Sequence, residues 1–202
     1  MTENESYYTI EKEAQAEFTD RGSRFIAYAF PVSSPEAFKL KLKELKEAHP
    51  KANHHCFAYR MGTEGLVFRV SDDGEPSGTA GRPILGQIDS RKVVNTAIVV
   101  VRYFGGTLLG VPGLINAYKT VAALVLQVTP VVQKQLQINY RIDLPYNRLN
   151  DVLQVLKQTQ STVLSQELQL FCFIECGIPK NRLTEVKYRL EQFSDVEFRP
   201  LA

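Results

Sequence analysis

The sequence lacks tryptophan and has only three cysteines, which is an odd number. So few cysteines argue against a disulfide framework and favour a reducing compartment. Net charge is also scarce: 24 basic and 22 acidic side chains leave a formal charge of +2. Any binding of nucleic acid would therefore depend on a local basic patch rather than on the field of the whole molecule. We expect a cytoplasmic protein without a disulfide-stabilised core.

Long apolar segments are missing as well. The longest runs, residues 97–101 and 121–126, are far shorter than the ~20 residues that span a membrane. The N-terminus is polar and carries early glutamates, unlike a secretory signal peptide. What is present is a chain of 202 residues, 44% hydrophobic and 10% aromatic. This composition is sufficient for one large or two small folded domains, and we expect no association with a membrane.

The most distinctive stretch is Asp72–Gly81, Asp-Asp-Gly-Glu-Pro-Ser-Gly-Thr-Ala-Gly. Its three glycines permit positive φ or close backbone approach, and Pro76 fixes one φ. Ser77 and Thr79 are residue types that cap helices, and we expect them to cap a helix that starts near Ala80. The stretch predicts either a rigid turn that faces a ligand or an ordinary capped turn between a strand and a helix.

A second glycine-rich stretch, residues 102–113, follows the apolar run 93–103, which is typical of a strand buried on both faces. Glycines between a strand and a helix expose backbone amides at the positive end of the helix dipole, where phosphate or carboxylate binds. Arg102 could add a bidentate contact to the same anion. The loop is neither a Walker sequence nor a dinucleotide fingerprint, so we expect no nucleotide cofactor. Tight packing of two loops without a ligand is the alternative.

The pattern along the chain predicts an α+β protein with two domains, residues 1–130 and 133–202. In the second domain the order β-α-β-β-α-β is that of a ferredoxin-like domain. Cys172 and Cys176 lie on one of its strands, about 13 Å apart at ~3.3 Å per residue, and are expected to be core thiols. In the first domain strands are expected at 7–18, 24–32, 54–60, 66–71 and 93–103, and helices after Ser34, at 80–90 and at 114–128.

Two segments resemble signatures of the YigZ/Impact family. They are residues 72–85, Asp-Asp-Gly-Glu-Pro-Ser-Gly-Thr-Ala-Gly-Arg-Pro-Ile-Leu, and residues 99–110, Val-Val-Val-Arg-Tyr-Phe-Gly-Gly-Thr-Leu-Leu-Gly. Residues 54–59 are similar to a third family segment, and the resemblance is strong over residues 1 to about 130. It implies a first domain like the second domain of a small-subunit ribosomal protein, also seen as domain four of elongation factor G. It implies a second domain like that factor's ferredoxin-like domain five.

The chain departs from the family pattern after the second glycine-rich loop. Family members usually read Gly-Thr-Gly-Gly-Leu-x-Arg-Ala-Tyr where residues 110–118 are Gly-Val-Pro-Gly-Leu-Ile-Asn-Ala-Tyr. Pro112 replaces a glycine, and Asn116 replaces a basic residue. An anion site that relies on that basic residue would lack it in this chain.

Two functions are open at this stage. The first is a non-enzymatic cytoplasmic protein linked to translation, which binds RNA, the ribosome or a translation-regulatory partner through a glycine-rich cleft. For eukaryotic relatives the resemblance implies a domain that modulates a stress kinase acting on translation initiation. This chain has no N-terminal extension of the kind those relatives carry, so we do not expect the kinase link here.

The second function is a peptidase-like hydrolase or a metal-dependent enzyme that uses His54, Asp72, Asp73 and Glu75. No ligand spacing of the HExxH or CxxC kind supports a metal, so we expect neither a metal nor a cofactor. The candidate residues of the cleft are His54, Asp72, Asp73, Glu75, Ser77, Gly78, Thr79, Arg82, Arg102, Tyr103, Gly105, Gly106 and Lys119.

Overall fold

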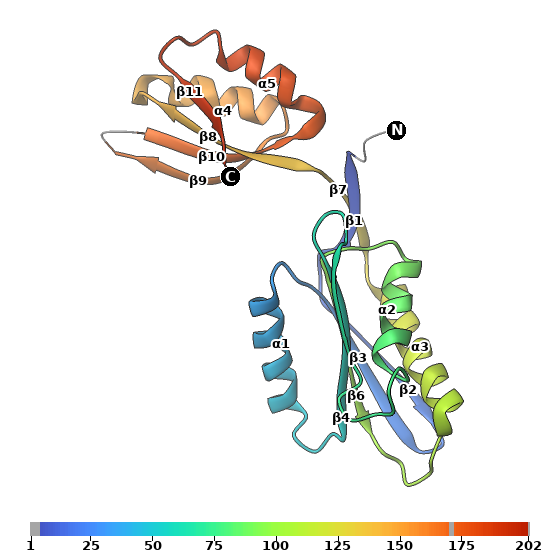
Figure 1. Cartoon of the computed structure of the whole chain (residues 1–202). Helices are drawn as coiled ribbons and strands as arrows, with labels where there is room; N and C mark the ends of the chain where they lie inside the picture. Colours follow the sequence, from blue (N-terminus) through green and yellow to red (C-terminus); the bar gives the residue numbers. More distant parts are fainter. Residues whose placement is uncertain (1–4, 170–171, 202) are drawn as a thin grey trace. The chain divides into compact units, whose positions relative to one another are not determined.

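The computed structural model describes residues 5–169 and 172–201. Within them the chain separates into two compact units, which divide between Lys134 and Gln135. Ser6, near the start of the chain, groups with the second unit. Figure 1 shows the helices and strands of both units. The structure is thus a mixed α and β protein with several sheets.

The first unit is built on five strands: β2 (Ala14–Asp20), β3 (Ser23–Pro31), β4 (His54–Met61), β5 (Val67–Ser71) and β6 (Thr96–Tyr103). They form one antiparallel sheet in the order β2-β3-β6-β4-β5. β6 is the central strand, and seven of its eight residues are buried. A continuous β-branched run predicts this burial, because a strand covered on both faces needs apolar side chains at every position.

Helices cover both faces of this sheet (Figure 1). α1 (Pro35–Ala48) lies on one face, and α2 (Gly81–Ser90) and α3 (Gly110–Val128) lie on the other. Side chains alternate along β6, so Val100 packs on the side of α2 and α3, whereas Val101 packs on the side of α1. The unit therefore has three layers and two apolar cores.

The starts of two helices follow from local chemistry. The Oγ atom of Ser34 accepts a hydrogen bond from the backbone amide of Ala37 at 3.1 Å and caps α1, as predicted. α3 begins at Gly110, earlier than the predicted Leu114. Pro112 does not prevent this early start, because an amide in the first turn of a helix has no partner to lose.

α3 is unusually apolar. By length and composition alone it could cross a membrane, a test that the core helices of soluble proteins also pass. Tyr118, Val121 and Val125 are fully buried in the core between the sheet and the helices α2 and α3. Val111 and Ile115, in its first two turns, are exposed instead. The apolar character of α3 therefore exceeds what its own core uses.

The strand predicted over residues 7–18 is divided in two. β1 (Ser6–Ile10) pairs with β7 (Val131–Gln135) in a separate two-stranded sheet, and β2 joins the five-stranded sheet. The charged residues 11–13 lie between them. Charged side chains are rarely buried, so a strand covered by a core is interrupted there.

The second unit has a four-stranded antiparallel sheet in the order β11-β8-β10-β9. The sequence also predicts a strand over residues 168–177, of which residues 170–171 lie outside the described residues. The elements follow the chain as β8 (Gln137–Leu144), the short 3₁₀ helix η1 (Tyr146–Arg148), α4 (Leu149–Gln158), β9 (Thr162–Leu168), β10 (Cys172–Pro179), the 3₁₀ helix η2 (Lys180–Arg182), α5 (Leu183–Leu190) and β11 (Glu197–Pro200).

One core holds this unit together. Ile142 and Ile174 of the sheet pack with Val152 and Val186 of the two helices. Cys172 and Cys176 are free and buried in the same core, as the sequence predicts. Burial raises the pKa of the Cys176 thiol to about 12, so it stays neutral at physiological pH.

The fold predicts a severe effect of a methyl group at Gly105. An added Cβ there would overlap backbone atoms of Gly22 and Ser23, in the turn between β2 and β3. We expect Gly105→Ala to lower the free energy of unfolding by about 2–3 kcal/mol, because rigid backbone must move. Urea unfolding measures the loss.

The matched control is Gly86→Ala, inside α2, where an added Cβ meets no atom within 4 Å. It should raise stability by about 0.5–1 kcal/mol through the gain in helix propensity. Wild-type stability of Gly105→Ala would show that the two turns do not touch in solution.

Candidate functional site

Asp72 organises the loop between β5 and α2. Its Oδ1 accepts hydrogen bonds from the amides of Ala80 and Gly81, both at 2.9 Å, and its Oδ2 accepts one from the amide of Gly78 at 2.8 Å. Burial pushes the pKa of this carboxyl upward. The three amides and the charge of Arg82 outweigh burial, so the pKa of Asp72 lies below its usual range. Asp72 is therefore an ionised helix cap.

The prediction that Ser77 and Thr79 cap α2 is wrong. Thr79 is buried, and its hydroxyl donates to the carbonyl of Pro76 at 2.7 Å. Ser77 is exposed, and no side chain at the N-cap position Ala80 bonds to the helix. The carboxylate of Asp72, at the start of the loop, caps the helix in place of the two hydroxyls that the local sequence suggested.

Asp73 fastens the same loop to β4. Its φ of 42° is left-handed, which turns its carbonyl toward His54 and its carboxylate toward His55. The Nδ1 of His54 lies 2.8 Å from that carbonyl and must donate to it. In the neutral ring the Nε2 of His54 then carries no proton, and it lies 3.9 Å from Oε1 of Glu75.

A buried ion pair lies at the centre of the site. Nη1 of Arg102 donates to Oε1 of Glu75 at 2.6 Å, and the side chains are only 6% and 4% exposed. The hydroxyl of Tyr118 donates to the same oxygen at 2.7 Å, and Nη2 of Arg102 donates to Ser23 at 3.3 Å. The pair joins the loop, β6 and α3. Nε of Arg102 is buried without a hydrogen-bond partner among the described residues.

The buried side chain of Cys56 contacts the same hydrogen-bond network. Its sulfur lies 3.0 Å from the carbonyl of Asp72 and 3.3 Å from the hydroxyl of Tyr118. Burial raises the pKa of Cys56 and of Tyr118 far above their ordinary values. A buried neutral thiol is a poor nucleophile, so Cys56 does not fit covalent catalysis.

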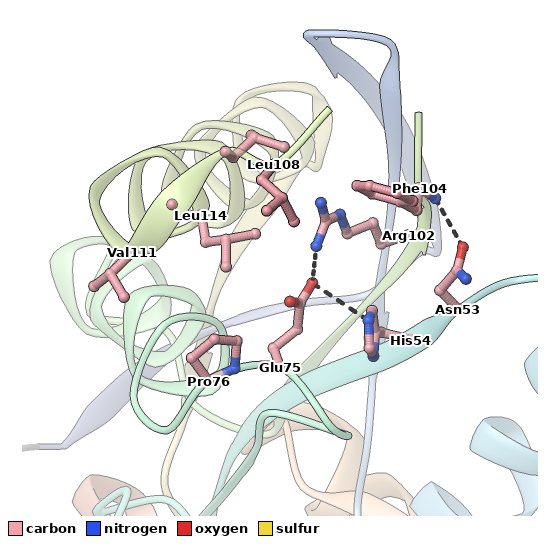
Figure 2. A pocket seen from close by; sticks show the side chains of 11 residues that line it. Asn53, His54, Glu75, Pro76, Arg102, Phe104, Leu108, Val111 and Leu114 are labelled. Carbon is pink, nitrogen blue, oxygen red and sulfur yellow. Dashed lines mark hydrogen bonds and ion pairs between the residues drawn. The ribbon is translucent and has the colours of Figure 1, made fainter. Parts of the chain in front are cut away.

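A cavity of about 460 Å³ opens beside the ion pair (Figure 2). Its size is that of pockets that accept small ligands or single side chains. Figure 2 shows Glu75, His54 and Arg102 on one side, with Leu108, Val111 and Leu114 across from them. The complete lining is Asn53, His54, Glu75, Pro76, Arg102, Phe104, Leu108, Leu109, Gly110, Val111 and Leu114.

Three of the residues predicted for the cleft therefore line the cavity: His54, Glu75 and Arg102. The structure places Tyr103 on the opposite face of the sheet, where its hydroxyl lies 2.8 Å from Nδ1 of His49. This follows from the alternation of side chains along β6.

The other predicted residues of the cleft do not line the cavity. Gly106 is exposed, and Arg82 and Lys119 are exposed on α2 and α3. Of the remaining six, Gly105 donates its amide to Ser23, and five are held by the loop described above or are exposed within it: Asp72, Asp73, Ser77, Gly78 and Thr79.

Two backbone amides at the start of the second glycine-rich loop form internal hydrogen bonds. The amide of Gly105 donates to Oγ of Ser23 at 3.2 Å, and the amide of Phe104 donates to Oδ1 of Asn53 at 2.8 Å. The expected array of amides facing an anion is not formed by these two groups.

Sequence reasoning missed the apolar wall of the cavity. Leu108 is 82% exposed and Val111 is 51% exposed, although both are large apolar residues. The signal that could have identified them is the pair Leu108 and Leu109 in an otherwise small and glycine-rich loop, where a connector has no need of leucine.

The residues proposed for catalysis are committed to other bonds. Asp72 accepts hydrogen bonds from three amides, and Asp73 accepts one from the amide of His55. Glu75 accepts hydrogen bonds from Arg102 and Tyr118. Across residues 5–169 and 172–201, no group of three or more His, Cys, Asp or Glu side chains could hold a metal ion. These bonds occupy all three acidic side chains of the proposed enzyme site, whereas His54 lines the cavity.

Comparisons with known proteins agree with the sequence motifs. Residues 21–126 match the family model of the Impact N-terminal domain. The IMPACT family member YigZ of Escherichia coli (strain K12) is 32% identical over 182 residues, which cover 89% of each chain. A crystal structure described as that of a hypothetical protein is 29% identical, covers 98% of both chains and has a TM-score of 0.78.

A further relative is Yih1, described as a two-domain translational regulator. It is 30% identical to this chain in sequence, and the aligned region covers 60% of this chain and 47% of the Yih1 chain. The TM-score is 0.36.

The capping role of Asp72 predicts the effect of its removal. We expect Asp72→Ala to cost about 2 kcal/mol at pH 7, the upper end of helix-cap effects, because three amides lose their acceptor. Ser77→Ala, in the same loop, should change the free energy of unfolding by less than about 0.5 kcal/mol. Urea titration of both variants measures the difference.

The same variants predict a pH dependence. Because the folded-state pKa of Asp72 is lowered, its contribution is present above its unfolded pKa of about 4 and is lost as pH falls through the folded value. The gap between wild type and Asp72→Ala should therefore shrink in acid. An equal cost for Ser77→Ala would contradict the assignment of the cap.

Proposed function

The chain belongs to the Impact family, and on that basis we propose that it is a non-enzymatic cytoplasmic protein linked to translation. It binds a partner of the translation apparatus through the cavity beside Glu75 and Arg102. The translational link is supported by the relative Yih1, which is described as a translational regulator. The binding role is supported by an open cavity with apolar walls in the part of the chain that matches the family model.

The observation that carries the non-enzymatic part is the saturation of the acidic side chains. A general base needs an unprotonated acceptor within reach of a substrate proton. Asp72 instead accepts hydrogen bonds from amides of its own loop, and Asp73 accepts one from β4. Glu75 is paired with Arg102. The hydrolase alternative would require one of these carboxylates to be released, or His54, which lines the cavity, to act as the base.

The class of partner follows from the charge of the cavity. Arg102 is neutralised by Glu75, so a phosphate in the cavity would bring a second anion beside a buried carboxylate. RNA, the ribosome and a translation-regulatory protein all fit the translational link. Of these, the cavity favours contact with protein over contact with RNA phosphates.

We also propose the kinship of the two units with known domains. The order β8-α4-β9-β10-α5-β11 and the sheet order β11-β8-β10-β9 support a ferredoxin-like second unit. The likeness of the first unit to domain four of elongation factor G is proposed from the family resemblance. Fold kinship does not assign function, so the proposal rests on the family and the cavity.

Sedimentation of a cell lysate tests the translational link. We expect the tagged protein to migrate with ribosomes or translation-factor complexes at about 50 mM salt and to leave these fractions near 500 mM, as polar contacts are screened. Protein that remains at the top of the gradient at both salt concentrations, and does not alter the yield of a cell-free translation reporter, would contradict the proposal.

A further inference from the structure

Exposed apolar side chains surround the mouth of the cavity. Leu108, Val111 and Phe104 line it and are 82%, 51% and 44% exposed, and Ile115 of α3 is 38% exposed. Val111 and Ile115 are four residues apart, so they occupy one face of α3. Single exposed apolar residues are ordinary, but a cluster that continues into a cavity marks a binding surface. We call Phe104, Leu108, Val111 and Ile115 the rim.

The floor of the cavity carries no net charge. Arg102 and Glu75 neutralise each other, and the hydroxyls of Ser23 and Tyr118 add one hydrogen bond to each of them. An ionised group that entered would be buried without a counter-charge, which is unfavourable. The cavity therefore selects an uncharged, apolar group.

Exposed positive charge lies on α3, beyond the rim, and on α2, which packs against α3. Lys119 lies one helical turn beyond Ile115 and is exposed, and Arg82 is exposed in the first turn of α2. Neither forms a salt bridge with a described residue, and α3 contains no acidic residue. An occupant whose apolar face carries acidic residues at its border would complement this surface.

We infer that the rim and the cavity bind an amphipathic helix of a protein partner, with apolar side chains on the rim and acidic ones facing Arg82 and Lys119. This rests on the proposed function and specifies its partner. The rim consists of side chains and offers no free strand edge, so an extended segment would leave its backbone unpaired. A helix satisfies its own backbone and presents apolar residues at the spacing of Val111 and Ile115.

The charges disfavour a second copy of this chain as the occupant. A two-fold contact through the rim would place Lys119 and Arg82 of one copy near the same cations of the other, with no acid on α3 to pair with them. RNA is disfavoured because four apolar side chains would face its phosphates.

The test is a selection from a random-sequence peptide library displayed on phage, with the purified full chain as bait. Peptides are counter-selected on the double variant Leu108→Ser, Val111→Ser, which should fold because both positions are exposed. We expect the surviving peptides to show apolar residues at helical spacing with Asp or Glu at the border. The best peptide should bind the double variant at least about tenfold more weakly than wild type.

A charge-reversal variant tests the role of the two cations, and a variant on another face of the sheet serves as the control. Arg82→Glu with Lys119→Glu should weaken the selected peptide by about tenfold, and a peptide with its acids changed to lysine should regain binding to that variant. Leu40→Ser is the control: Leu40 is 67% exposed on α1, on the opposite face of the sheet, and its loss should leave binding unchanged.

Several results would overturn the inference. They are selected peptides without helical spacing or with basic borders, no peptide that depends on Leu108 and Val111, or a labelled oligouridine strand that binds through these residues more tightly than the peptide. A dimer in sedimentation velocity that the double variant dissociates would assign the rim to a second copy. The selection uses purified protein, so its failure leaves the translational link standing, and failure of lysate sedimentation leaves the rim standing.

Discussion

The ion pair of Glu75 and Arg102 is the interaction on which the first unit depends at the end that carries the cavity. It joins a loop, the central strand and, through Tyr118, the helix α3. A buried ion pair persists only when other hydrogen bonds complete it, and Ser23 and Tyr118 supply these bonds. The close contact of Gly105 with the turn at Gly22 brings Ser23 under the guanidinium, so the two turns and the ion pair require each other.

This arrangement decides what the cavity can do. The sequence suggested two turns that meet and present amides and a guanidinium to an external anion. In the structure Arg102 is paired with Glu75, and the amides of Phe104 and Gly105 donate to Asn53 and Ser23, so the groups still exposed at the cavity are mainly those of the apolar wall and rim. The same commitment of charge removes Asp72, Asp73 and Glu75 from general base catalysis. These internal bonds leave the apolar wall and the rim as the surface that we propose for binding.

The sequence predicted those features that local chemistry determines. The Ser34 cap, the burial of β6 and the order of elements in the second unit all follow from short-range patterns. Pairing between residues far apart in the sequence could not be predicted from local patterns. Asp72 caps a helix eight residues later, which no capping rule anticipates, and Glu75 is paired with a residue on the central strand. The apolar rim was missed because only the fold shows that Leu108 is exposed beside a cavity.

A double-mutant cycle on Glu75 and Arg102 tests the central claim most directly. Glu75→Gln, Arg102→Met and the double variant are unfolded in urea at pH 7. Each single change should cost about 3–5 kcal/mol, because it leaves a buried charge without its partner. The double variant should cost less than the sum of the two by at least about 1.5 kcal/mol. Costs that add to within about 0.5 kcal/mol would show that the pair is not coupled, and would contradict this account of the site.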